Sequence, residues 1–389
     1  MTSRERMLAA LECRPVDHVP CSFMLFGNLR SRCRTDEEFV RRQLEMGLDA
    51  YCHTGFLEPS IHPEARESVW VTEEGPRTVY HRRIDTPRGP LTQQVLEAEG
   101  WPRSDDFCMF NDWIVPRALE VLVKPEEDLE KLPYLLGPFT DEAIGRLGSS
   151  AAAARSFARE EDLLLVGGWC SLSTSPVRDD GVMGADAMSW LSGFEEVCAL
   201  SLLKPEVVCE YARIIHEWNM RQLEITLDVA APDLVLRRGW YETTEFWTPG
   251  AYREVILPLL TREAELVHEA GSRLGLVTTS AFLPIIDDIL CSGIDVLVGL
   301  DPKEGKGTDL GAVKGRFHQE GRAIWGGVSG SMTVERGTAE ETEEAVAEAI
   351  DVLAPGGGFI LSPVDNVRDD TELAWTNTER FIEAWRRLR

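Results

Sequence analysis

The chain has 389 residues, 43% of them hydrophobic, and a formal net charge of −26. Such a composition is ordinary for a globular protein with a sizeable core. Because so acidic a surface repels phosphate backbones and anionic lipid, we expect neither nucleic acid nor membranes as partners. No run of 18 apolar residues occurs, and the opening MTSRERMLAALECRP resembles an amphipathic helix rather than a signal peptide, so a cytoplasmic protein is predicted.

Nine cysteines are scattered along the chain without a C-x-x-C pair or a short secreted framework. This usage predicts reduced thiols that pack as small buried hydrophobes.

The first third of the chain predicts two buried strands, at Pro20–Phe26 and Ala50–His53, with a helix at Glu37–Gly47 between them. Between residues 68 and 97 the pattern changes to short alternating segments separated by Gly-Pro and Pro-Arg-Gly turns. That pattern predicts an inserted meander of antiparallel strands. A short acidic helix is expected at Val123–Leu132.

The second half alternates short apolar runs with segments of helical spacing. The predicted strands are Leu163–Trp169, Leu234–Arg238, Leu274–Thr279, Val296–Asp301, Ala323–Ser329 and Phe359–Ser362. The predicted helices are Pro249–Ala270, Phe282–Cys291, Ala339–Leu353 and 371–388. Continuous apolar runs are typical of parallel strands that are covered on both faces. Eight strands in strand–helix units predict an α/β fold, a (β/α)8 TIM barrel with an N-terminal β-hairpin or meander insertion, and a single domain over residues 1–389.

In a parallel barrel the reactive groups lie on the loops after the strands, so the polar residues there are the candidate site. The candidate catalytic residues are Glu242, Asp301, Tyr241 and Asp365. The candidate substrate-binding residues are Asn28, Arg30, Arg34, His53, Arg238, Trp240, Thr279, Ser329 and Asn366. Guanidinium groups bind carboxylates or phosphates, aromatic rings floor pockets, and neighbouring carboxyl groups raise one another's pKa and supply a general acid or base.

Each candidate also has a plain structural interpretation. The arginines of NLRSRCR suit a solvated loop, and His53 suits a hydrogen-bonded core position. Asp301 suits the cap of a turn before Pro302, and Asp365-Asn366 suits turn formation.

Several nucleotide and cofactor motifs are missing. Gly305–Thr308 lacks the spacing of a phosphate loop, and Gly356–Gly358 precedes a strand instead of opening a helix. The sequence holds no D-x-H-x-x-G, with which corrinoid-binding domains supply a cobalt ligand, so any cobalamin is expected on another chain.

Several stretches, in order along nearly the whole chain, resemble the uroporphyrinogen decarboxylase superfamily. They are MTSRERMLAALECRPVDHVP, YHRRIDTPRGPL, VKPEEDLEKLP, GFEEVCALSLLKPEVV, FWTPGAYREVILPLL and GGGFILSPVDNVRDDT. The resemblance implies a (β/α)8 barrel with its site at the C-terminal mouth, and one of two chemistries. Decarboxylases of this superfamily carry an R-Q-A-G-R-Y type segment, where this chain reads GNLRSRCR, and a histidine where Asp365 and Asn366 stand.

Corrinoid-dependent methyltransferases form the other branch, and many hold zinc with an H-x-C and a further Cys. Here those places read Thr278-Thr279-Ser280 and Asp365, so the thiol-activating zinc site is not expected. The order of Asp180, Glu195 and His216 is similar to the carboxylate–carboxylate–His set of aromatic O-demethylases in this branch. Glu195 and His216 also have the pattern of ordinary helix residues.

The resemblance and the missing decarboxylase motif favour a methyltransferase that moves a methyl group from a small methylated substrate to cobalamin on a separate corrinoid protein. Glu242 or Asp301 would then be the general acid that helps the leaving group depart. The alternatives are a cofactor-independent decarboxylase of a porphyrinogen or other acid, and a non-catalytic binding protein. A homodimer is the expected assembly.

Overall fold

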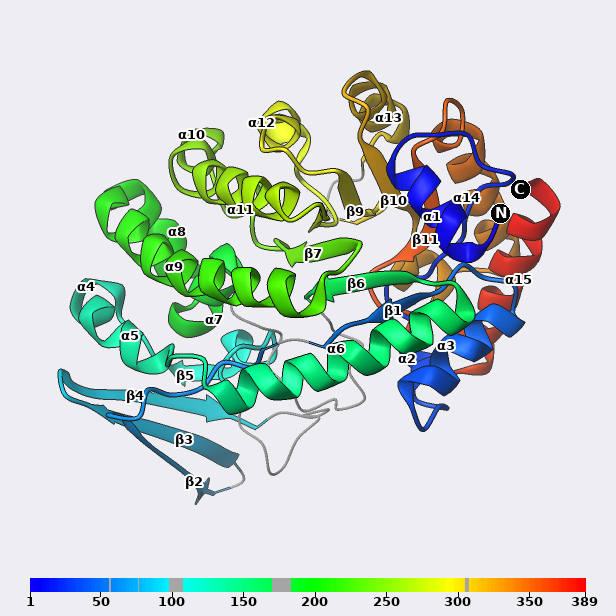
Figure 1. Cartoon of the computed structure of the whole chain (residues 1–389). Helices are drawn as coiled ribbons and strands as arrows, with labels where there is room; N and C mark the ends of the chain where they lie inside the picture. Colours follow the sequence, from blue (N-terminus) through cyan, green and yellow to red (C-terminus); the bar gives the residue numbers. More distant parts are fainter. Residues whose placement is uncertain (56, 76, 98–107, 170–182, 305–307) are drawn as a thin grey trace.

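The centre of the molecule is a curled sheet of seven parallel strands (Figure 1). The computed structural model describes residues 1–55, 57–75, 77–97, 108–169, 183–304 and 308–389. The strands lie in the order β1 (Tyr51–His53), β6 (Leu164–Gly168), β7 (Leu234–Arg238), β8 (Arg273–Val277), β9 (Val296–Leu300), β10 (Ala323–Ser329) and β11 (Phe359–Val364). The strand prediction of the second half is therefore confirmed within a few residues at each end.

The predicted strand at Pro20–Phe26 does not form as a regular strand, so that prediction is corrected. The segment makes two isolated parallel bridges, Cys21 to Leu361 and Leu25 to Asn366. Between them the Met24 N–H donates to Ser362 Oγ at 2.7 Å, so a side chain takes the place of a backbone carbonyl and interrupts the ladder. On its other side, the carbonyl of Cys21 accepts from the backbone N–H of Asp49, just before β1.

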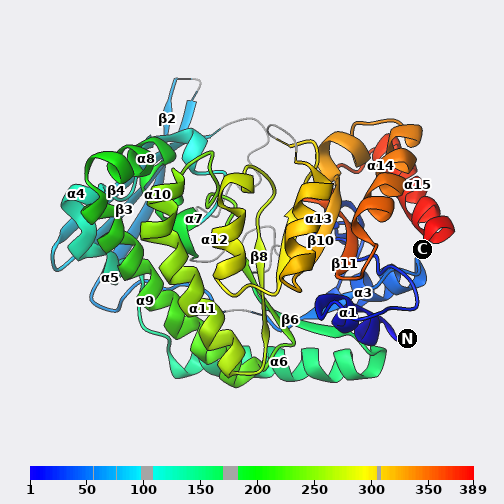
Figure 2. The ribbon, with the colours of Figure 1, turned by 90° about the horizontal axis from the view of Figure 1, so that it is seen from above.

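Helices cover the outer face of this sheet, as Figure 2 shows from above. The helices of the first half of the chain, not all of which lie on that face, are α1 (Ser3–Leu11), α2 (Gly27–Arg30), α3 (Asp36–Glu45), α4 (Pro125–Asp128), α5 (Leu132–Leu135) and α6 (Asp141–Glu161). Between β6 and β8 lie α7 (Gly184–Ser192), α8 (Phe194–Leu203), α9 (Pro205–Ala230), α10 (Pro249–Ala251) and α11 (Leu257–Glu269). The rest are α12 (Ile286–Cys291), α13 (Leu310–Gln319), α14 (Ala339–Leu353) and α15 (Glu372–Leu388).

Threonine caps begin several of these helices. The side chains of Thr248, Thr338 and Thr371 each accept from a backbone N–H three residues later. Such a cap satisfies one of the N–H groups that have no partner within the helix. The helix starts predicted at Pro249 and Ala339 are confirmed.

A second, antiparallel sheet is inserted between β1 and β6. Its strands, in the order β2-β3-β4-β5, are β2 (Arg66–Glu74), β3 (Arg77–Thr86), β4 (Gly89–Leu96) and β5 (Ala118–Glu120). The predicted meander is confirmed, and β5 extends it beyond residue 97.

Side chains on the central strands alternate between two hydrophobic clusters. On β7, Leu234 and Leu236 belong to the cluster inside the curled sheet, and Val235 belongs to the one beneath the outer helices. Because neighbouring side chains on a strand point to opposite faces, Arg238 continues the inner row and Arg237 the outer row.

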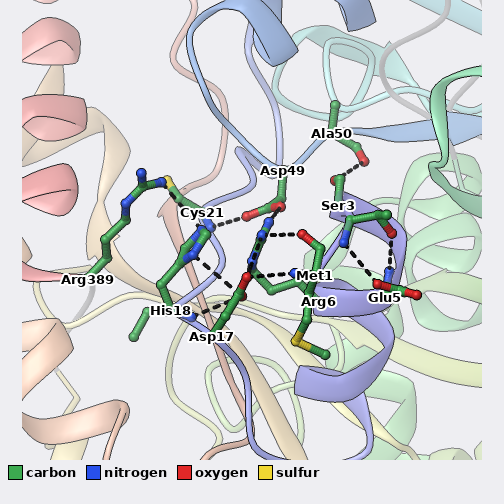
Figure 3. A network of polar contacts seen from close by, with 12 residues as sticks. Met1, Ser3, Glu5, Arg6, Asp17, His18, Cys21, Asp49, Ala50 and Arg389 are labelled. Carbon is green, nitrogen blue, oxygen red and sulfur yellow. Dashed lines mark hydrogen bonds and ion pairs between the residues drawn. The ribbon is translucent and has the colours of Figure 1, made fainter.

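A buried ion-pair network lies at the N-terminal end of the strands (Figure 3). Arg6, 9% exposed, pairs with Asp49 at 2.5 Å and with Asp17 at 2.7 Å. Burial raises the pKa of Asp49, and Arg6 opposes that shift. Arg6 lies on α1 and Asp49 lies just before β1, so the network anchors α1 to the start of β1.

In the described part of the chain, no helix is both long and apolar enough to cross a membrane.

Candidate active site

Arg238, at the C-terminal end of β7, is the centre of a buried polar cluster. Its side chain is fully buried and points inward. The guanidinium donates to Asp186 Oδ2 at 2.7 Å and to Asp112 Oδ2 at 2.6 Å. It also lies over the rings of Trp190 and Trp240, at 4.6 and 4.2 Å from their centroids. The ring of Tyr241 lies 5.4 Å away, so two carboxylates and three aromatic rings surround one cation.

Asp186 comes from α7 and holds the start of the loop after β7. Its carboxylate accepts from the backbone N–H of Tyr241 at 2.8 Å and of Trp240 at 3.3 Å. Complete burial raises the pKa of Asp186 to about 6, even though Arg238 opposes the shift. This carboxyl group therefore titrates close to neutrality.

Asp112 comes from the insertion and is 40% exposed, so it forms the open side of the cluster. It accepts hydrogen bonds from the Tyr241 hydroxyl and, at 2.8 Å, from Trp190 Nε1. Burial raises the pKa of Tyr241, and the negative charge of Asp112 raises it further. The phenol therefore stays protonated and donates to Asp112.

Arg237 points the other way and forms a second buried network behind β7. It pairs with Glu242 and, at 2.8 Å, with Glu263 of α11, which His216 of α9 contacts at 3.3 Å. Burial would raise the pKa of Glu263, but Arg237 and His216 lower it to about 2. Glu242 also accepts from the backbone N–H of Ala185 at 3.0 Å, so this carboxylate holds the N-terminus of α7.

A group of acids lies after β9 and β11. Asp301 Oδ1 accepts from the backbone N–H groups of Lys303 at 2.8 Å and Glu304 at 3.0 Å, which is the geometry of a turn cap. Burial raises the pKa of Glu304, and the charges of Asp301 and Asp365 raise it further. Asp365 has a left-handed backbone, with φ 62°, which aspartate tolerates better than most residues.

This acid group and the Arg238 cluster face the same space. Burial raises the pKa of Asp365, and the charges of Asp112 and Arg238 act on it as well. Residues from the ends of β7, β9 and β11 and from the insertion thus meet at one mouth.

The other predicted residues at strand ends serve mainly to hold the loops. Ser329 Oγ accepts from Met332 N–H at 3.3 Å, and Asn366 Oδ1 from Gly27 N–H at 2.9 Å. Asn28, fully buried, donates to the carbonyl of Asp369 at 3.4 Å.

His53 and Thr279 belong to the inner rim. Burial lowers the pKa of His53 to about 4, so the ring is neutral, and its Nδ1 accepts from Gly55 N–H at 3.0 Å. A hydrogen bond from Thr279 partly offsets the raised pKa of Glu304.

Arg30 and Arg34, two of the candidate substrate-binding residues, make local contacts. Arg30 donates to the carbonyl of Cys33 at 2.8 Å and pairs with Asp36 at 3.2 Å. The backbone N–H of Arg34 binds Glu38. Their described contacts thus stay within the α2–α3 region and do not reach the Arg238 cluster.

Three important residues were not singled out from the sequence, namely Asp112, Asp186 and Glu304. The adjacent arginines after β7 were the available signal, because two buried guanidinium groups need acidic partners. With 66 acidic residues in the chain, spacing alone does not select those partners.

The described residues do not bring together three or more His, Cys, Asp or Glu side chains in a way that would hold a metal ion. Of the three residues that resemble a carboxylate–carboxylate–His metal set, Asp180 lies outside the described residues, Glu195 lies in the first turn of α8, and His216 contacts Glu263. The loop at Gly305–Gly307 also lies outside them.

Comparisons with known proteins place the fold. The family model described as "Uroporphyrinogen decarboxylase (URO-D)" matches residues 185–388. A methyltransferase from Methanosarcina mazei has a similar structure, with a TM-score of 0.59 and 17% sequence identity, covering 100% of this chain and 99% of its own. A B12-independent methionine synthase from Shewanella sp. W3-18-1 matches with a TM-score of 0.42 and 8% identity, covering 95% of this chain and 96% of its own. No curated protein sequence matches. The matched region is more than half of the chain, and the chain belongs to the uroporphyrinogen decarboxylase (URO-D) family.

Proposed function

We propose that this protein is a methyltransferase that takes a methyl group from a small methylated substrate and passes it to cobalamin carried by a separate corrinoid protein. The reaction would take place at the mouth formed by the ends of β7, β9 and β11. The family, the fold shared with a methyltransferase over the full chain, and the charge of the mouth support this proposal.

The observation that carries the proposal is the pairing of Arg238. A porphyrinogen with many carboxylates requires basic groups that are free to bind them. Arg238 is already paired with Asp186 and Asp112, and Arg30 is paired with Asp36. The mouth therefore suits a neutral or positively charged substrate better than a polyanion.

The geometry also suggests a division of roles among the predicted acids. Glu242 is held by Arg237 and Ala185, so we assign it to positioning α7, which carries Asp186. Asp301 shapes the turn that carries Glu304. Asp365, whose pKa is raised, suits the proton donor that an oxygen leaving group would need. A nitrogen leaving group that is already cationic would need none.

Segment Pro20–Phe26 bonds to β11 on one side and to Asp49, before β1, on the other. We propose that it closes the sheet as the eighth element of a TIM barrel, within a single domain. The residues that we propose to line and support the mouth are Tyr241, Trp240, His53, Thr279, Ser329, Asn28 and Asn366.

The test is to incubate the protein with reduced cobalamin and a panel of methoxy compounds and methylated amines, and to follow methylcobalamin by its absorbance and mass. Methylcobalamin that appears only with active protein supports the proposal. No methylcobalamin across the panel, together with loss of CO2 from a porphyrinogen, would instead establish the decarboxylase alternative.

A further inference from the structure

Strand β2 forms one edge of the inserted antiparallel sheet and lies on the outside of the molecule (Figure 1 and Figure 2). Its 9 residues pair with β3 in one continuous register, without a bulge. Every second residue of an edge strand turns its backbone N–H and C=O groups away from the sheet, where they can bind another strand. β2 is therefore a long edge to which a further strand can be added.

The middle of β2 is apolar and exposed to solvent. Val69, Trp70 and Val71 are 47%, 44% and 47% exposed. Because neighbours on a strand point to opposite faces, the two valines lie on one face and Trp70 on the other, where it stacks on His81 at 5.1 Å. Proteins usually protect an exposed edge with Pro, Lys or a bulge, and the strand RESVWVTEE contains none of them. An unprotected apolar edge of this kind favours pairing with another chain.

The sequence of β2 complements itself when two copies run antiparallel about a two-fold axis at Trp70. In that register Trp70 lies opposite its own copy. The other pairs that the register makes with the second copy are Val69–Val71, Ser68–Thr72 and Arg66–Glu74. Apolar residues therefore meet apolar residues, hydroxyl residues meet each other, and residues of opposite charge stand at both ends. Directly opposite residues are the ones that stabilise an antiparallel pair, so a second copy is the occupant that this edge fits.

One pair in this register joins like charges, because Glu67 lies opposite Glu73 of the second copy. Two uncompensated carboxylates at that position would repel each other. However, Arg82 of β3, 3% exposed, pairs with Glu67 at 2.7 Å. Glu67 therefore brings little net charge to the edge, and the pair does not prevent association.

We propose that β2 is the contact between two copies of this chain, which join their inserted sheets into one continuous antiparallel sheet. A contact that uses the same edge on both copies closes on itself, so the product is a dimer and not a filament. Strand pairing by itself buries less surface than a standard interface, so we expect a dissociation constant of about 10–100 µM. The inference goes beyond the proposed function, since the mass of the particle and not its turnover tests it.

Sedimentation equilibrium of the full chain measures this mass as a function of concentration. Salt near about 0.15 M screens the repulsion between two chains of charge −26. We expect the mass to rise from one chain towards two between about 5 and 300 µM. A single species with the mass of one chain throughout that range would overturn the proposal.

Charged substitutions locate the contact. Val69→Lys and Val71→Lys each place a charge in the apolar centre of the pair and should weaken association at least about 10-fold. Both positions are exposed, so the variants should fold, which circular dichroism checks. Leu203→Lys, at the end of α8 and 78% exposed, is the matched control and should associate as the unmodified chain does. A dimer that both valine variants leave intact would show that another face is used and would overturn the proposal.

A cysteine on the two-fold axis tests the register. The Cα atoms of directly opposite residues lie about 4.5–5.5 Å apart, which a disulfide bond can span. Oxidation should therefore join two Trp70→Cys chains, which keep both valines. Residue 73 would lie about 20 Å from its own copy, so Glu73→Cys is the matched control. It should cross-link no more than the unmodified protein, in which the exposed Cys291 sets the background. Equal cross-linking of the two variants would contradict a two-fold axis at Trp70.

Discussion

Replacing Arg238 by methionine tests the buried cluster most directly. Methionine keeps much of the volume and still contacts the aromatic rings, but it removes the cation. Asp186 is then left fully buried, with only the backbone N–H groups of Trp240 and Tyr241 as partners. Asp112 remains 40% exposed and can be hydrated, so the cost comes mainly from Asp186.

The expected loss of unfolding free energy is about 3–5 kcal/mol near pH 8, the usual cost of leaving one buried charge without its partner. The loss should depend on pH in a defined direction. Burial already raises the pKa of Asp186 to about 6, and Arg238 lowers it, so removing Arg238 raises it further. Between about pH 4 and that raised pKa the folded variant binds a proton that the unfolded chain does not, so its stability increases as the pH falls.

Urea unfolding followed by circular dichroism, near pH 8 and near pH 5, measures this effect. Near pH 5 Asp186 of the variant is neutral, so its burial without a cation is less unfavourable. The loss of unfolding free energy caused by Arg238→Met should then fall to about 1–2 kcal/mol. Arg262→Met is the matched control, because Arg262 and Glu265 are both 56% exposed, and it should cost less than about 1 kcal/mol at either pH. A cost for Arg238→Met that is below about 1 kcal/mol near pH 8, or equal at both pH values, would refute this account of the cluster.

Three further substitutions probe other parts of the molecule. Glu242→Gln breaks the buried pair with Arg237 and should cost about 3 kcal/mol, seen as a lower urea midpoint; an unchanged midpoint would contradict the positioning role. Arg30→Ala should alter the methyl-transfer rate less than about twofold, because Arg30 pairs locally, whereas a rate reduced to background would favour the decarboxylase type of site. Asp49→Asn leaves Arg6 buried beside only the more exposed Asp17, and should cost about 3 kcal/mol without changing the methyl-transfer rate, since this network lies at the other end of the strands. A changed rate in folded Asp49→Asn would show that the two ends are coupled.

The strands of the second half were predictable because each is a continuous apolar run bounded by helical spacing. The helix starts at Thr248 and Thr338 were predictable because a cap depends only on residues within one turn. The segment at Pro20–Phe26 has the same apolar character, so a regular strand was predicted there. In the structure it instead makes two isolated bridges, Cys21 to Leu361 and Leu25 to Asn366. Its pairing is interrupted by Ser362 Oγ, from a strand more than 300 residues away, which no local pattern reveals.

The sequence predicted where the candidate site lies, but not which residues pair with one another there. Arg238, Tyr241 and Asp365 do lie at strand ends around one mouth, as a parallel sheet requires. Their roles as catalytic or binding groups remain predictions. Asp186, from α7, and Asp112, from the insertion, were not found, because which acid approaches a buried arginine depends on how distant helices and loops pack.

By itself, the sequence determined the strand–helix alternation, the inserted meander and the edge at which polar side chains gather. Periodicity and turn chemistry act over a few residues, so they can be read along the chain. Only the tertiary structure decided that Arg237 and Arg238, neighbours on one strand, enter two separate ion-pair networks. The reason is that a strand points successive side chains to opposite faces, and the partners on each face come from segments far away in the sequence.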